Sequence, residues 1–185
     1  MPLVGCFQCE IPRWPSSCVA GLLGTTKHAN KGEGHMRKKP AAKVADVLKI
    51  KGPGTTTIKP SETIGMLARR LQQERLGAMI VSSDGRTVDG IISERDVAYG
   101  VALHKGDLHA LPVAALMTKN AVTCTPEDTV AEVSRVMAER HIRHLPVVDG
   151  GQLVGVISMR DIFRHRLDEM QRMTQLLGSY VAAGR

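Results

Sequence analysis

The chain has 185 residues, of which 43% are hydrophobic and 23% charged, a composition typical of a globular protein with a buried core. No apolar run reaches the roughly 18 residues of a membrane span, and the first residues lack a secretory pattern, so we expect a cytoplasmic protein. Aromatic residues make up only 3%, which argues against base-stacking platforms for single-stranded nucleic acid. The net charge of +7 favours an anionic partner, but the basic residues are scattered, so we do not expect nucleic acid or membrane binding.

Residues 1–43 differ from the rest of the chain. They contain Pro2, Pro12 and Pro15 and show no sustained strand or helix periodicity, which predicts an irregular or disordered extension. Cys6 and Cys9 form a C-x-x-C pair, the pattern of half a zinc site or a redox motif. No second ligand pair stands at zinc-binding spacing, so we expect no metal there and interpret the pair as thiols of an unstructured segment.

From Val44 onward the chain repeats itself. The segment TIKPSETIGMLARRL at Thr57 matches TCTPEDTVAEVSRVM, which begins 66 positions later at Thr123. The phrase GIISERD at 90–96 returns as GVISMRD at 155–161, and VADVLKI at 44–50 matches VAALMTK at 113–119. This many matches in nearly one register indicate a duplication, with copies at 44–105 and 106–165.

Each copy predicts the same elements, in the order β-α-β-β-α. A short β segment ends near Pro60 or Pro126, and a helix with apolar residues at core spacing follows it; Thr129 and Glu132 suit a capping box at the second of these helices. The expected strands are Ala78–Val81, Val88–Ile92, Leu145–Val148 and Leu153–Ile157, and a further helix begins after Ser93 or Ser158. Such a unit cannot bury both faces of its sheet, so we expect an α+β fold in which two units stack sheet to sheet.

The remaining residues, 166–185, predict a C-terminal helix or tail. Phe163, Leu167, Met170, Met173 and Leu177 fall on one stripe, as in an amphipathic helix. The stripe would pack against its own domain or a second subunit, and it favours a homodimer.

The duplicated unit, which ends in Gly-h-h-Ser-x-x-Asp (h, hydrophobic), resembles the CBS domain, and the two copies resemble a CBS pair, or Bateman module. The resemblance covers about residues 44–165. It implies a cleft between the copies that holds an adenine nucleotide such as AMP, ADP, ATP or NAD(H), with no required cofactor and no catalytic role.

The resemblance also implies roles for individual residues. Asp96 and Asp161 would hold ribose hydroxyls, and the serine three residues before each would lie near sugar and phosphate. The arginine before each aspartate would face phosphate. Arg143 and His144, just before the strand that contains Pro-Val-Val, would add basic contacts. The threonine in the first β segment of each copy would lie at the usual place of contact with adenine. The full set is Thr57, Ala78, Ser93, Arg95, Asp96, Thr123, Arg143, His144, Pro146, Ser158, Arg160 and Asp161.

The chemistry of these residues agrees with that assignment. A carboxylate can accept hydrogen bonds from both hydroxyls of a vicinal diol, while phosphate suits a guanidinium fork and the free N–H groups of a helix N-terminus. Ser-x-x-Asp is also a plain capping box, and one aspartate is not expected to serve both roles fully. The copies differ, because Arg143 and His144 correspond to Gly77 and Ala78; the second half-site should therefore bind phosphate better, unless Lys51 and Lys59 compensate in the first.

The leading functional hypothesis is a non-enzymatic sensor of adenine nucleotides that regulates an unidentified protein target. The alternative is a constitutive protein interaction module with unfilled nucleotide sites. A nucleic-acid binder is the third hypothesis and would require salt-dependent binding. Cys124 has no evident base partner, so we interpret it as a small buried residue rather than a nucleophile.

Overall fold

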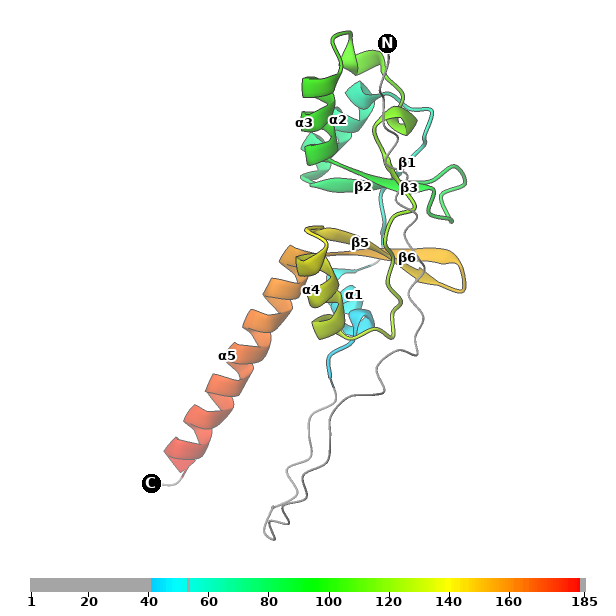
Figure 1. The fold of residues 1–185 in the computed structure, drawn as a ribbon. Coiled ribbons are helices and arrows are strands. Elements are labelled where there is room, and N and C mark those ends of the chain that lie inside the picture. Colours follow the sequence, from blue (N-terminus) through cyan, green and yellow to red (C-terminus); the bar gives the residue numbers. More distant parts are fainter. Residues whose placement is uncertain (1–40, 53, 184–185) are drawn as a thin grey trace, which may run out of the picture. The chain divides into compact units, whose positions relative to one another are not determined.

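The computed structural model describes residues 41–52 and 54–183, with side chains as far as residue 175 (Figure 1). The C-x-x-C pair and nearly all of the expected N-terminal extension lie outside these residues. The described part begins with helix α1 (Val44–Lys51) and then forms the two expected copies.

The first copy has the predicted β-α-β-β-α order. It contains β1 (Thr57–Ile58), α2 (Ile64–Glu74), β2 (Ala78–Val81), β3 (Gly90–Ser93) and α3 (Glu94–Leu103). Strand β1 runs parallel to β2, with Thr57 opposite Ile80, and β3 runs antiparallel to β2, with Ser93 opposite Ala78. A further short strand, β4 (Thr118–Lys119), pairs with the free edge of β3.

The second copy repeats this arrangement with α4 (Val130–Glu139), β5 (His144–Asp149), β6 (Gln152–Ser158) and α5 (Met159–Ala183). In place of β1, Cys124 pairs with β5: its amide donates to the Pro146 carbonyl at 3.0 Å, and its carbonyl accepts from the Val148 amide at 2.8 Å. The predicted capping box of Thr129 and Glu132 begins α4. The duplication is also visible in the backbone conformation: Arg75 and His141, which follow α2 and α4, both adopt a φ of 54°.

Each hydrophobic core contains residues from the segment that precedes the other copy, which we call the leading segment of that other copy. Val44 and Val47 of α1, which precede the first copy, lie in the second core beside Val130. Two short 3-10 turns, η1 (Leu108–Ala110) and η2 (Val113–Ala115), return to the first core through Val113. Backbone hydrogen bonds fix both crossings, from the Val44 amide to the Asp128 carbonyl at 2.9 Å and from the Val113 amide to the Glu62 carbonyl at 2.8 Å. Each copy is therefore completed by the segment that precedes the other.

The sheets of the two copies face each other, with α2 and α3 on the outer side of one and α1 and α4 on the outer side of the other (Figure 1). The predicted α+β fold and its sheet-to-sheet stacking are thus confirmed. Hydrogen bonds also join the copies: the Leu153 amide donates to the Arg86 carbonyl at 2.6 Å, and Arg95 Nη1 donates to the His141 carbonyl at 3.2 Å.

The glycine of each repeated phrase is needed because a leading segment crosses over it. A Cβ at Gly90 would lie 2.6 Å from the Thr118 carbonyl oxygen, and one at Gly155 would lie 2.9 Å from Leu48 Cδ2. At Gly90 the neighbour is rigid backbone, so only glycine lets β4 approach β3 this closely, whereas at Gly155 an added methyl group would displace the flexible Leu48 side chain of α1.

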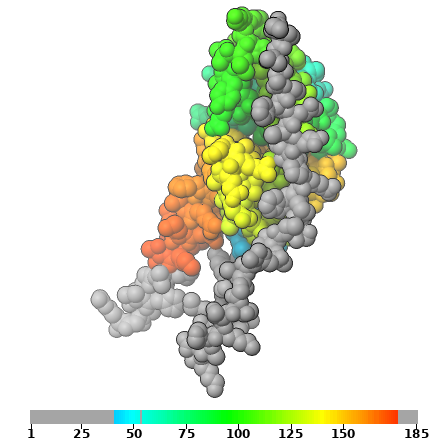
Figure 2. All heavy atoms as spheres, in the orientation of Figure 1, coloured from blue at the N-terminus to red at the C-terminus, as the bar shows by residue number. Residues whose placement is uncertain are grey.

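Helix α5 runs for 25 residues from Met159, with no break at the expected boundary near 165. Its apolar stripe is open to solvent along the part whose side chains are described: Phe163 is 65% exposed and Met170 67%. In Figure 2 this part of α5, drawn in orange to red, lies beside the yellow α4. On α3, Tyr99 and Leu103 are also exposed. Within the described residues, no helix is both long and apolar enough to cross a membrane.

Candidate functional site

The two repeated phrases place a Ser–Asp pair at the start of α3 and of α5. In the first copy, the Ser93 amide and hydroxyl donate to Asp96 Oδ2 at 2.7 and 2.6 Å. In the second, Ser158 makes the same two bonds to Asp161 Oδ2 at 2.9 and 2.7 Å. The capping-box interpretation is therefore correct for both phrases.

Capping occupies only one oxygen of each aspartate. All the described hydrogen bonds to the carboxylates of Asp96 and Asp161 go to Oδ2, and among the described residues none reaches either Oδ1. Oδ1 retains two acceptor lone pairs, which agrees with the expectation that one aspartate does not serve both roles with its whole carboxylate. Each aspartate can cap its helix and still accept from a diol through a single oxygen.

Several of the helix amides to which the sequence assigned phosphate are already paired. At α5 the Ser158 amide bonds to Asp161, the Met159 amide to the Arg143 carbonyl at 2.9 Å, and the Asp161 amide to the Ser158 hydroxyl at 3.3 Å. At α3 the Ser93 amide is likewise taken, and the Glu94 amide donates to the Gly77 carbonyl at 3.1 Å. Amides that are already paired are not available to an anion, so a phosphate here would depend mainly on side chains.

Lys51, at the last turn of α1, supplies a cation to the second half-site. Its Nζ donates to Asp161 Oδ2 at 3.0 Å and to the Val156 carbonyl at 2.8 Å. Burial alone would raise the pKa of Asp161, but the hydrogen bonds from Ser158 and Lys51 outweigh it and hold the pKa below its ordinary value. The carboxylate therefore stays ionised at neutral pH.

The suggestion that Lys51 replaces the missing positive charge in the first half-site is wrong. Because α1 packs on the second copy, Lys51 adds charge to the half-site that already has Arg143 rather than to the first. Lys59 does not compensate by any described side-chain hydrogen bond either; its backbone amide bonds to Glu62. The charge difference between the half-sites is thus larger than the sequence indicated.

His144 lies between the two copies. It stands opposite Ser158 in the β5–β6 pair, and its Cε1 lies 3.2 Å from where a Cβ of Gly77 would be. Burial lowers the pKa of His144, and Arg143 and Lys51 lower it further, against the opposing effects of Asp161 and Glu94. The imidazole is therefore neutral at neutral pH, and the positive charge of this half-site comes from Lys51 and the arginines.

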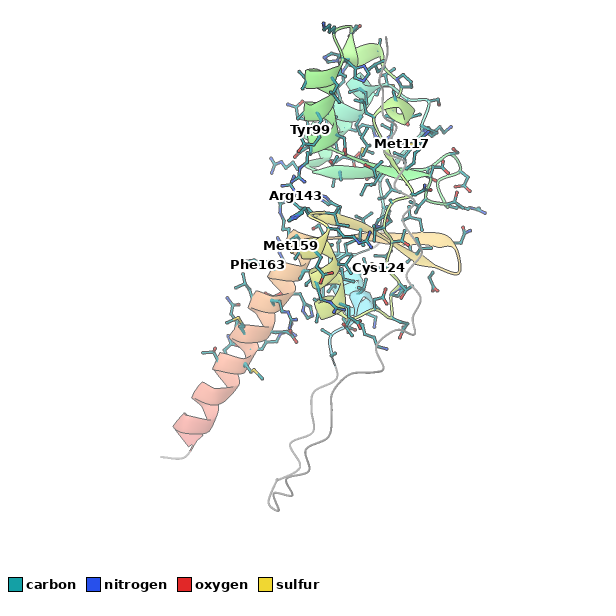
Figure 3. The ribbon with its side chains drawn as sticks, viewed as in Figure 1. Tyr99, Met117, Cys124, Arg143, Met159 and Phe163 are labelled. Carbon is teal, nitrogen blue, oxygen red and sulfur yellow. The ribbon has the colours of Figure 1, made fainter. Side chains whose placement is uncertain are left out.

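The other predicted site residues are distributed around these two centres. Arg143 and Arg160 are exposed, and Figure 3 shows Arg143 on the side of the second sheet that faces the first. Thr57 is half-buried in β1, whereas Thr123 is exposed. Ala78 and Pro146 are buried in β2 and β5. Cys124 is buried as expected, and burial raises the pKa of its thiol to about 12, which leaves it inert as a nucleophile.

Sequence reasoning missed a groove between α1 and β6. Its walls include Leu48, Lys51, Gly54, Val154 and Val156. The groove thus adjoins the Lys51–Asp161 contact through Lys51 itself. The sequence contains no local signal for it, because it forms only when α1 crosses to the second copy.

Two stacked β-α-β-β-α units with a Ser–Asp pair at the last helix of each define a tandem-repeat module. The CBS-domain family model matches residues 36–102 and 113–168, and the chain therefore belongs to the CBS-domain family.

Solved structures agree with this assignment. A CBS-domain protein from Agrobacterium tumefaciens is 35% identical, with a TM-score of 0.65 over 68% of this chain and 99% of that one. The CBS protein CBSX2, solved in complex with AMP, is 22% identical, with a TM-score of 0.59 over 70% and 98% of the two chains. The CBS pair of MJ0100, solved with 5′-methylthioadenosine and S-adenosyl-L-methionine, is 24% identical, with a TM-score of 0.62 over 70% and 99%. At these last two identities, the likeness concerns the fold.

Proposed function

We propose that this protein is a cytoplasmic, non-catalytic regulator that binds adenine nucleotides between its two CBS copies. The observation that carries the proposal is the paired Ser–Asp arrangement, in which each aspartate keeps one carboxylate oxygen available to ribose hydroxyls. Adenosine-containing ligands in CBS proteins of the same fold support the ligand class. The candidate ligands are AMP, ADP, ATP and NAD(H).

Binding would act through the contacts that join the copies. Arg95 reaches the His141 carbonyl, and Leu153 reaches the Arg86 carbonyl. A ligand that touches both copies shifts their arrangement only by the difference in its affinity for the two states. The output would pass to a protein target or to the oligomeric state.

The test is a thermal-shift screen of the full chain against AMP, ADP, ATP and NADH, followed by calorimetry. Ligand that binds only the folded state raises the unfolding temperature with concentration. We expect at least one nucleotide to do so, and Asp161→Asn to weaken its binding. Absence of any shift or heat with all four nucleotides would reject the proposal.

The second candidate function is a constitutive interaction module. It is favoured by the first half-site, where Gly77 and Ala78 bring no charge and the Ser93 and Glu94 amides are already paired. This module would bind its protein partner equally well with and without nucleotide, whereas the regulator would not. A pull-down repeated at saturating nucleotide separates the two.

We also propose that the chain forms a homodimer through α3 and α5. Tyr99 and Leu103 on α3 and Phe163 and Met170 on α5 are all more than half exposed, and large apolar side chains of this kind mark interfaces when they cluster. Figure 3 shows Tyr99 and Phe163 directed outward from their helices on the same side of the molecule. Light scattering coupled to size-exclusion chromatography would give the mass of a dimer if this is correct.

A further inference from the structure

We infer that Lys51 makes the second half-site selective for adenosine that carries a 5′-phosphate over adenosine itself. The inference rests on the proposed function and specifies the ligand class of one of its two half-sites. Lys51 was not among the residues that the family resemblance assigned to binding.

The first step concerns what can hold a phosphate at this place. Three amides at the start of α5 are already paired, those of Ser158, Met159 and Asp161. His144 is neutral at neutral pH because burial and two neighbouring cations lower its pKa. A phosphate beside Asp161 must therefore be balanced by lysine or arginine side chains.

The second step concerns which cation is already in position. Lys51 is held by Asp161 Oδ2 and by the Val156 carbonyl, and these bonds use two of the three ammonium protons. The third proton remains for a ligand oxygen. Arg143 and Arg160 are exposed, and among the described residues their guanidinium groups have no hydrogen-bond partner, so each must lose side-chain freedom to reach a phosphate. Lys51 is already fixed and loses less.

The third step is the comparison with the first half-site. Alignment of VADVLKIK at 44–51 with VAALMTKN at 113–120 places Asn120 at the position of Lys51. Gly77 stands where the second copy has Arg143, and Arg95 is engaged by the His141 carbonyl. The first half-site thus has an equivalent aspartate without a cation bonded to it, because the described bond of Arg95 goes to the other copy; we therefore expect phosphate selectivity to be stronger in the second half-site.

The experiment measures the affinity of AMP and of adenosine by calorimetry on the full chain. An Asp96→Asn background removes the first half-site, so that the titration reports the second. Lys51→Met removes the charge, Lys51→Arg retains it, and Lys49→Met is the matched control, since Lys49 lies on the same helix, is 77% exposed and pairs only with Asp46. Thermal unfolding of each variant confirms that it is folded.

A charged hydrogen bond of this kind corresponds to a loss of about tenfold or more in affinity when it is removed. We expect Lys51→Met to lose AMP affinity by that factor and to change adenosine affinity less than about twofold, with Lys51→Arg and Lys49→Met near the parent. Equal losses for AMP and adenosine would show that Lys51 only positions Asp161, and unchanged AMP binding would show that it has no role; either result overturns the inference. A wild-type protein that binds another of the four nucleotides but not AMP would overturn the inference and leave the proposed function standing, whereas binding of none of the four would mean that the proposed function itself has failed.

Discussion

Lys51 and Asp161 stand 110 positions apart, yet their side chains meet at 3.0 Å. The contact exists because α1 packs into the core of the second copy rather than into the copy that follows it. The ion pair therefore connects the exchange of leading segments to the candidate ligand site.

The first prediction is that Asp161 makes stability depend on pH. Its pKa in the folded protein lies below the ordinary value, so the stabilisation is present above the unfolded pKa of about 3.9 and is lost as the pH falls toward the folded pKa. Asp161→Asn should cost about 1 kcal/mol at pH 7, the usual value of a helix cap. Urea unfolding at pH 7 and at pH 3 should show the difference between wild type and variant shrinking at the lower pH; a constant difference would contradict the assignment.

The second prediction concerns the glycines of the repeated phrases. Gly90→Ala should destabilise the fold by about 1–3 kcal/mol, because its Cβ would meet the rigid Thr118 carbonyl and overpacking of this kind costs that much. Gly155→Ala should cost less, since the Leu48 side chain that it meets can move. Gly106→Ala is the control: its Cβ meets nothing within 4 Å, and a surface change should stay within about 0.5 kcal/mol. Equal losses for Gly90 and Gly106 in denaturant unfolding would refute the close approach of β4.

The third prediction tests the exchange of leading segments. Val47 is 4% exposed in the second core, while Ile50 on the same helix is 60% exposed. Val47→Ala should cost about 2 kcal/mol through the cavity that it leaves, and Ile50→Ala should cost about 0.5 kcal/mol or less. Chemical denaturation of the two variants measures both values. Similar values would mean that α1 does not complete this core.

The sequence predicted the repeated elements well because local patterns determine them. Strand β2 begins and ends at the expected residues, and the caps at Ser93, Thr129 and Ser158 are present. The sequence did not predict β4, the crossing of α1 or the place of Lys51, since each depends on which copy a segment packs against. Periodicity reveals that Val44 and Val47 are buried, but it does not reveal in which of two similar cores.

The same limit applies to the site. The repeated phrase pointed to the two aspartates. That Oδ2 accepts the capping hydrogen bonds while Oδ1 accepts none of those described can be seen only from atomic positions. The pairing of the Glu94 and Met159 amides could not be predicted either, because their acceptors, the carbonyls of Gly77 and Arg143, come from the residues just before β2 and β5.

The last prediction concerns the exposed stripe of α5. Phe163→Glu should convert a dimer to a monomer, because a charge in the apolar centre of an interface cannot be paired and typically costs several kcal/mol. Arg164→Glu, one residue further along the same helix and also exposed, is the matched control and should leave the mass unchanged. Sedimentation equilibrium over a range of concentrations measures both, and thermal unfolding verifies that each variant is folded. A wild-type protein that sediments as a monomer at every concentration would exclude the dimer, whereas a dimer that survives Phe163→Glu would place the interface elsewhere.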